Sequence, residues 1–146
     1  MSEEPETLCE EVMSTPPIKA MPMQTVLEGA KIMAENNIGS LIIVDEQDSL
    51  LGIVTKTDII VNVVAKGLDA SKVKLADIMS KNPYYVFRNT TLREAAEMMG
   101  SYNIGHLPVL DPETYKVVGI ISKRDIIRLA PHYIDLVYYV GKANQF

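Results

Sequence analysis

Two short segments of the chain combine a hydroxyl, cationic residues and a carboxylate within four positions. Residues 55–58 read Thr-Lys-Thr-Asp, and residues 122–125 read Ser-Lys-Arg-Asp. Each follows an apolar run and precedes an apolar helical pattern, so the hydroxyl falls where a strand passes into a helix. The free backbone amides of a helix start favour phosphate, and a carboxylate in the first turn can accept hydrogen bonds from both hydroxyls of a ribose. The two segments are therefore candidate binding corners.

The same residue types also have a purely structural interpretation. A Ser or Thr followed three residues later by an acidic residue is an ordinary helix cap, and a single example is more often a cap than a site. Duplication copies a cap as readily as a binding site. Recurrence alone therefore does not decide between the two interpretations.

An internal repeat supplies the elements that would position these corners. Residues of the same type recur 66 positions apart, as in Met13 and Met79 or Gly39 and Gly105. After a turn that is longer by one residue in the second copy, the offset becomes 67, as in Asp58 and Asp125. A copy of this size cannot bury its apolar faces alone, so the two copies are expected to form one pair of β-α-β-β-α units.

The pattern of each copy predicts its helices and strands. Thr25 and Thr91 begin capping boxes, and each is followed by an apolar stripe at helical spacing. Strands are predicted at 41–44, 51–55, 84–87, 107–110 and 117–122. The helices that start at the corners are predicted at 58–66 and 125–130, a short helix at 71–79, and an amphipathic helix at 133–141 with Ile134, Val137 and Tyr138 on one side.

Composition limits the classes of function. The chain has 146 residues, 47% hydrophobic residues and a formal net charge of −5, which argues against a dedicated nucleic-acid binder. Cys9 is its one cysteine, so no intrachain disulfide can form. With only two histidines besides, the chain lacks the ligands of a structural zinc site. No apolar run approaches a membrane span of about 20 residues and the acidic start has no signal core, so we expect a cytoplasmic protein.

With this repeat, the chain resembles a tandem pair of CBS domains, also called a Bateman module. The resemblance is carried by Met79, Pro83, Thr91, Asp111 and the segments 104–109 and 119–125, while Ile42 stands where the family often has the proline seen here as Pro108. It covers about residues 8–131. It implies an α/β fold of two CBS repeats, at 8–67 and 72–131, related by a pseudo-twofold axis. Each repeat would be a small mixed sheet flanked by helices. A C-terminal helix or tail would follow at 132–146.

The resemblance implies a non-enzymatic regulatory module without a cofactor of its own. Such modules bind adenosine-containing ligands (AMP, ADP, ATP, S-adenosylmethionine, sometimes dinucleotides) in clefts between two repeats. They form flat homodimers and signal to a partner, here unknown. Two other classes stay open. The first is a ligand-free dimerisation or assembly module, and the second is an enzyme in which His106 and Asp58 would be an acid-base pair.

The family pattern also implies which residues contact the ligand. One cleft would combine Thr55, Lys56, Thr57 and Asp58 with Ser80, Tyr85 and His106, and the other would combine Ser122, Lys123, Arg124 and Asp125 with Ser14, Lys19 and Ser40. His106 is either a phosphate contact or a half-buried histidine with local hydrogen bonds, and Tyr85 either stacks on adenine or packs on its strand. Because Ser40 is neutral where His106 is basic, the two clefts are expected to differ.

Overall fold

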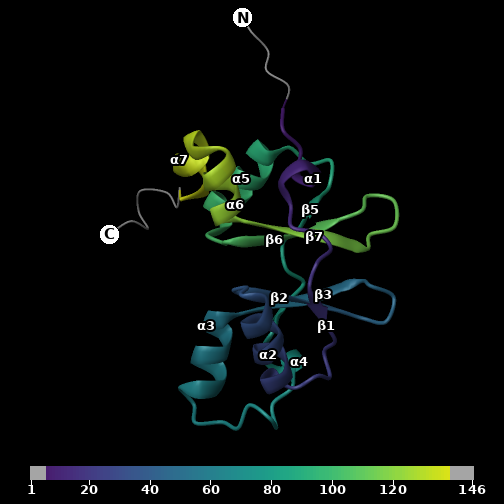
Figure 1. Ribbon diagram of the computed structural model, residues 1–146, viewed down its shortest axis with the longest axis vertical. Coiled ribbons are helices and arrows are strands. Elements are labelled where there is room, and N and C mark those ends of the chain that lie inside the picture. The colour runs from purple at the N-terminus through teal and green to yellow at the C-terminus, as the bar shows by residue number, and fades with distance from the viewer. Residues whose placement is uncertain (1–5, 139–146) are drawn as a thin grey trace, which may run out of the picture. The chain divides into compact units, whose positions relative to one another are not determined.

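The computed structural model describes residues 6–138, which form two compact units (Figure 1). Unit 1 contains residues 6–17 and 84–138, and unit 2 contains Ile18–Pro83. The units therefore differ from the repeats counted along the sequence, because the segment before Ile18 packs with the second repeat. Cys9 shows the reason: its side chain is fully buried in the core of unit 1, beside residues such as Leu92 and Ile126.

Unit 2 is a four-stranded mixed sheet with helices on one face. Its strands are β1 (Lys19–Ala20), β2 (Ser40–Val44), β3 (Leu50–Thr55) and β4 (Ser80–Lys81), in the order β1-β2-β3-β4. Strands β1 and β2 are parallel, and the other two pairs are antiparallel. The helical elements are α2 (Val26–Asn36), α3 (Lys56–Ile59), the π-helical turn η1 (Ile60–Val64) and α4 (Leu75–Ile78).

Unit 1 repeats this plan with three named strands. They are β5 (Val86–Phe87), β6 (His106–Leu110) and β7 (Val117–Ser122), with β5 and β6 parallel and β6 and β7 antiparallel. The helices are α1 (Cys9–Val12), α5 (Leu92–Tyr102), α6 (Lys123–Leu129), the 3-10 turn η2 (Pro131–Tyr133) and α7 (Ile134–Val137). The α/β fold with two small mixed sheets flanked by helices is as predicted.

Local sequence signals account for the main helix ends. The Thr25 hydroxyl accepts a hydrogen bond from the Glu28 amide, and α2 ends at Asn37 in the left-handed conformation with φ 52°. The Thr91 hydroxyl caps α5 in the same way, and α5 also ends at a left-handed asparagine, Asn103. Asparagine tolerates this conformation better than most residues, so the same side chain stops the same helix in both units.

The structure also shortens or changes three predicted elements. The helix predicted at 71–79 is only Leu75–Ile78, and the strand predicted at 84–87 is only Val86–Phe87. The helix predicted at 58–66 begins as α3 and continues as the π-helical η1 before Gly67. Residues 139–141 of the predicted C-terminal helix lie outside the described residues. No helix between residues 6 and 138 has the length and apolar character to cross a membrane.

Two glycines allow a neighbouring segment to lie close to the second strand of the β-hairpin in each unit. A Cβ built on Gly119 of β7 would be 2.5 Å from Met13 Sδ and 2.9 Å from the backbone oxygen of Ser14. A Cβ on Gly52 of β3 would be 2.6 Å from Met79 Sδ and 2.8 Å from the backbone oxygen of Ser80. Glycine is therefore required at both places, because any side chain would push these segments away from the sheet.

Candidate functional site

In unit 2, predicted site residues lie on the sheet face opposite the helices. Ser40 pairs with Thr55 across β2 and β3, and Ile53 pairs with Ser80 across β3 and β4. Lys19 is opposite Ile42, which in turn is opposite Ile53. Directly opposed residues share a face, as do residues two apart on one strand, so the side chains of Lys19, Ser40, Thr55 and Ser80 all belong to the helix-free face.

The same register holds in unit 1. His106 pairs with Ser122 across β6 and β7, and Pro108 pairs with Ile120. Ser14 forms a β-bridge to Ile120, with its amide 2.9 Å from the Ile120 oxygen. Ser14, His106 and Ser122 therefore share one face of the sheet. The sequence identified these residues, but it did not identify the close approach of residues 13–14 to β7, which Gly119 permits.

Strand pairing shows which predicted residues are neighbours within one unit. His106 lies opposite Ser122, in the unit that contains Asp125, and Ser40 lies opposite Thr55, in the unit that contains Asp58. In each case the pair joins the two ends of one β-hairpin, which are 16 positions apart in unit 1. The family pattern combines residues of both repeats in each cleft, and that grouping stays a prediction.

The two candidate carboxylates sit at the helix starts and act as caps. The Asp58 Oδ2 atom accepts a hydrogen bond of 2.8 Å from the Thr55 amide, and the Thr55 hydroxyl accepts one of 3.2 Å from the Asp58 amide. Asp125 and Ser122 make the same two bonds, both of 3.1 Å. The structural interpretation of the motif as a capping box is therefore correct for both copies.

Capping uses only one oxygen of each carboxylate. Among the described residues, Asp58 Oδ1 accepts no hydrogen bond, and Asp125 Oδ1 has only Arg128, whose guanidinium lies 3.4 Å away on the exposed side. The Asp125 side chain as a whole is 14% exposed. A cap and a ribose contact are thus compatible on the same side chain, one through each oxygen.

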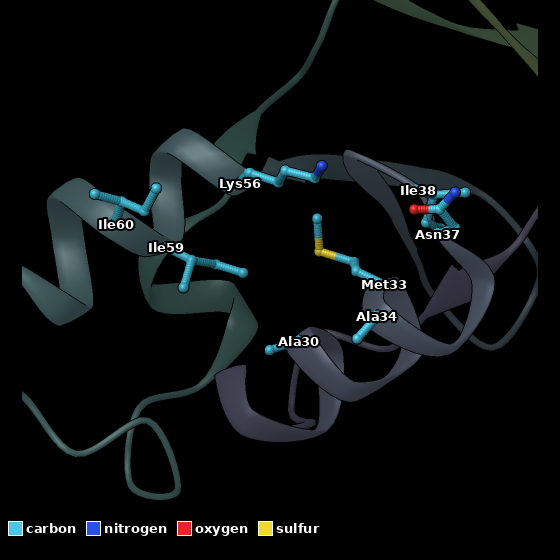
Figure 2. Close-up of a pocket in the computed structure, with 8 residues that line it drawn as sticks. All are labelled: Ala30, Met33, Ala34, Asn37, Ile38, Lys56, Ile59 and Ile60. Carbon is cyan, nitrogen blue, oxygen red and sulfur yellow. The ribbon is translucent and has the colours of Figure 1, made fainter.

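The corner lysines are directed toward the helices of their own units. The Lys123 ammonium lies over the Tyr138 ring, 4.6 Å from its centroid, and its stem passes Gly105. Lys56 passes Gly39 in the same way and lines a groove beside α2 (Figure 2). Arg124 is an exposed cation of the unit 1 corner, and the neutral Thr57 occupies the equivalent position in unit 2.

His106 makes the two corners differ further. Burial lowers its pKa below the ordinary value of 6.5, the neighbouring carboxylate of Asp125 opposes that shift, and Lys123 adds to it. At neutral pH the imidazole is therefore uncharged, with one nitrogen able to donate and the other able to accept a hydrogen bond. The hydroxyl of the buried Ser40 stands at the equivalent place in unit 2.

Lys19 and Tyr85 are equivalent residues, and each contacts the hairpin turn of its own unit. Lys19 Nζ forms an ion pair of 2.7 Å with Asp48. Tyr85 packs edge-on against Phe87 and Tyr115, at centroid distances of 5.5 and 6.5 Å. The predicted packing role of Tyr85 is thus present, while its exposed fraction of 37% leaves part of the ring free for stacking. Within residues 6–138, no group of three or more His, Cys, Asp or Glu side chains could hold a metal ion.

The repeat, the sheet order and the duplicated corners can now be compared with known proteins. The family model described as CBS domain matches residues 9–65 and 75–132. The chain belongs to the CBS domain family. Two such domains in one chain form a tandem pair, which is the family that the sequence motifs resembled.

Relatives with this CBS pair include proteins of different kinds. The chain is 38% identical over 125 residues to an L-aspartate semialdehyde sulfurtransferase of Methanocaldococcus jannaschii, covering 86% of this chain and 23% of that protein. It is 34% identical over 120 residues to an uncharacterised protein of Methanopyrus kandleri, covering 82% of this chain and 61% of that one. It is also 30% identical over 110 residues to hypoxic response protein 1 of Mycobacterium tuberculosis, covering 75% and 76%. The chain thus spans less than two thirds of the first two relatives.

Solved CBS structures have the same fold. The CBS domain pair of protein MJ0100, in complex with 5′-methylthioadenosine and S-adenosyl-L-methionine, has a TM-score of 0.76 at 38% identity, over 88% of this chain and 98% of that one. Hypoxic response protein I with two coordinated zinc ions has a TM-score of 0.75 at 28% identity, over 84% and 98%. A hexameric CBS-CP12 protein from bloom-forming cyanobacteria has a TM-score of 0.78 at 29% identity, over 88% and 74%.

Proposed function

We propose that this CBS domain pair binds adenosine-containing ligands at its two corners and regulates another protein, without catalysing a reaction. In unit 1 the ligand contacts are Ser14, Tyr85, His106, Ser122, Arg124 and Asp125, with Lys123 at the rim. In unit 2 they are Lys19, Ser40, Thr55, Thr57, Asp58 and Ser80, with Lys56 at the rim. The observation that carries the proposal is the Oδ1 atom that capping leaves unused on each carboxylate, beside a row of polar side chains on a helix-free sheet face.

The likeness to the MJ0100 pair supports the ligand class. That protein was crystallised with two adenosine derivatives, and this chain covers 98% of it at 38% identity. Each capping carboxylate can accept hydrogen bonds from the two ribose hydroxyls that all these compounds share. Binding that stabilises one arrangement of the module over another would shift their populations, which is how a binding module regulates a partner.

The difference between the corners predicts a difference in ligand. The unit 1 corner offers Arg124 and the imidazole N–H of His106, so it is suited to a ligand with phosphate, such as AMP or ATP. The unit 2 corner offers the hydroxyls of Ser40 and Thr57 at the equivalent places, so it is suited to an adenosyl compound without phosphate. S-adenosylmethionine and 5′-methylthioadenosine are compounds of this second type.

Isothermal titration calorimetry with AMP, ADP, ATP, S-adenosylmethionine and 5′-methylthioadenosine tests the proposal. We expect Asp125→Asn to abolish binding of the phosphorylated ligand and Asp58→Asn to abolish binding of the other ligand. Asp77→Asn is the matched control, because Asp77 caps α4 through the Lys74 amide at 3.0 Å and lies outside both corners. Absence of binding for all five compounds at millimolar concentration, or equal losses in all three variants, would contradict the proposal.

Ligand-free assembly is the second candidate, and the hexameric CBS-CP12 neighbour favours it. In that case sedimentation would give the same oligomeric state with and without each compound. It would also give the same state for Asp58→Asn, Asp125→Asn and the natural sequence. A change in oligomeric state with ligand that both variants lose would instead support regulation through the corners.

A further inference from the structure

The corner lysine of unit 1 has an aromatic partner near the end of the described chain. The Lys123 amide donates a hydrogen bond of 2.9 Å to the Gly105 oxygen, and the lysine stem passes over this glycine. Beyond the glycine, the ammonium lies over the Tyr138 ring, 4.6 Å from its centroid. Within residues 6–138 the ammonium forms no ion pair, so the cation–π contact is what holds its charged end.

Tyr138 is placed by the helix that it follows. It is the C-cap of α7, and its amide donates a hydrogen bond of 3.2 Å to the Ile134 oxygen. Val137 anchors α7 in the core of unit 1 at 1% exposure, and Leu136 packs against the same core. Tyr138 is 55% and Ile134 is 47% exposed, so the inward face of this helix differs from the face predicted from the sequence. The ring can therefore leave Lys123 without uncovering the core.

The equivalent lysine of unit 2 has no aromatic partner among the described residues. The Lys56 amide donates a hydrogen bond of 3.1 Å to the Gly39 oxygen, so its stem starts in the same way. The side chain then lines the groove between α2 and α3–η1, a volume of about 330 Å³ with no aromatic lining residue in the described chain (Figure 2). In unit 1, α7 packs on α5 at the equivalent place (Figure 1) and brings Tyr138 to the lysine. The tyrosine is thus a feature of unit 1, the unit in which we place the phosphate-bearing ligand.

The position of the Lys123 ammonium lets a ligand phosphate compete with the ring. Burial is the main reason for the low pKa of His106, and the positive charge of Lys123 adds to it, so the two side chains are close. His106 and Arg124 are the phosphate contacts proposed above. The lysine stem is flexible, so its ammonium can turn toward a phosphate beside them without movement of the backbone. A charge-assisted hydrogen bond to phosphate is stronger than a cation–π contact at an exposed site.

We propose that Tyr138 is a specificity-determining residue of the unit 1 corner. It holds the Lys123 ammonium away from the ligand, and a phosphate-bearing ligand takes the ammonium from the ring and frees the end of α7. A ligand without phosphate leaves the contact intact. The inference rests on the proposed function, because it needs a phosphate-bearing ligand at this corner. Since coupling between two sites is reciprocal, the contact with Tyr138 weakens phosphate binding as much as phosphate weakens the contact.

NMR of the full chain with ¹³C-labelled lysine tests the contact directly. The methylene protons next to the Lys123 ammonium should be shifted upfield by the ring, and Lys123→Arg identifies their signal by removing it. We expect saturating ATP to move this signal toward the position of a lysine in an unstructured peptide. We expect 5′-methylthioadenosine to leave the signal in place. Tyr138→Leu should give the unstructured position without any ligand.

Calorimetry with ATP measures the coupling. Tyr138→Leu should bind ATP about threefold more tightly, because no ring then competes for Lys123. Tyr138→Phe keeps the ring face, so its affinity should return to that of the natural sequence. Ile134→Ala, at another exposed position of α7, controls for loosening of the helix and should bind ATP like the natural sequence. The affinity for 5′-methylthioadenosine should be the same in all four proteins.

The outcomes separate this inference from the proposed function. If ATP binds the natural chain while the Lys123 signal stays upfield, or if Tyr138→Leu binds ATP no more tightly than the natural chain, the inference is overturned and ligand binding stands. A gain of equal size in Ile134→Ala would also overturn it, since loosening of α7 would then be the cause. If no phosphorylated compound binds the natural chain at millimolar concentration, the proposed function fails, and the inference fails with it.

Discussion

Units 1 and 2 have the same backbone plan, but they differ at the places where something can bind. The helices α2 and α5 begin at a threonine and end at a left-handed asparagine, and both corners are capping boxes. On this common frame, unit 1 carries His106 and Arg124 where unit 2 carries Ser40 and Thr57. Unit 1 also covers its helix groove with α7, and unit 2 leaves the groove open. Duplication thus preserved the local folding signals, while the binding surfaces diverged.

In each unit, residues at the first strand contact the hairpin turn, but the side chains that make this structural contact differ between the units. In unit 2 the ion pair of Lys19 and Asp48 joins the first strand to the turn, and in unit 1 the aromatic cluster of Tyr85, Phe87 and Tyr115 does so. Asp48 and Tyr115 both have positive φ, at 66° and 61°, so the turn geometry is shared although the chemistry is not. A partly exposed ion pair contributes about 1 kcal/mol or less, and each T-shaped aromatic pair contributes about 0.5–1.5 kcal/mol.

The largest expected effect concerns a feature that both units share, the close approach of a neighbouring segment to a glycine of β7 or β3. Gly119→Ala should lower the free energy of unfolding by about 1–3 kcal/mol, because the new Cβ forces Met13 and the Ser14 backbone away from β7. Gly52→Ala should do the same through Met79 and Ser80. Urea denaturation followed by circular dichroism measures both variants.

Gly105→Ala is the control for these two changes. Its Cβ would meet only Lys123 Cδ, at 3.9 Å, so the substitution should be neutral or slightly stabilising. If Gly119→Ala and Gly105→Ala unfold at the same urea concentration, the close approach of residues 13–14 to β7 is not needed for stability.

A second, smaller effect tests the difference between the grooves. Val137→Ala removes two methyl groups from a position that is 1% exposed, and it should lower the free energy of unfolding by about 1.6 kcal/mol at about 0.8 kcal/mol each. Val64→Ala, beside the open groove, removes the same groups from a side chain that is 66% exposed and should have almost no effect. Thermal denaturation of both variants measures the difference. Equal losses would mean that the unit 2 groove is covered in solution.

The smallest expected effect concerns the corner histidine. Burial keeps the pKa of His106 below 6.5 in the folded chain, so as the pH falls below 6.5 the unfolded chain binds a proton before the folded chain does. This contribution to stability is therefore fully present above pH 6.5 and is lost as the pH falls through the folded-state pKa. The urea midpoint of the natural sequence should fall between pH 7.5 and 5.5 by more than that of His106→Asn.

Two observations make this measurement specific. The pKa of Asp111 is lowered by hydrogen bonds from the Glu113 and Thr114 amides, so this carboxylate titrates below the window. Ser40 at the equivalent place of unit 2 does not titrate at all. Equal slopes for His106→Asn and the natural sequence would show that His106 is not desolvated in the folded chain.

The site shows what could be predicted from the sequence and where prediction stopped. The two corner segments were predicted with their helix starts, their hydroxyls and their carboxylates, because a cap is a contact between residues three positions apart. The grouping of His106 with Asp58 across a cleft stays a prediction, because strand pairing shows only that His106 lies opposite Ser122 within its own sheet. The inward face of the last helix was predicted wrongly, because Leu136 rather than Tyr138 packs into the core.

What the sequence determined by itself is everything that depends on neighbours along the chain. The capping hydroxyls, the left-handed asparagines, the apolar strands and the 66-residue repeat can all be found without a structure, because a few adjacent side chains fix the backbone there. Only the tertiary structure decided that Met13 and Ser14 lie on β7, that His106 lies opposite Ser122, and that α7 packs on the core of unit 1 while the groove beside α2 stays open. Those outcomes depend on burial and on the approach of distant segments, and no short-range pattern encodes which of two similar surfaces a segment will cover.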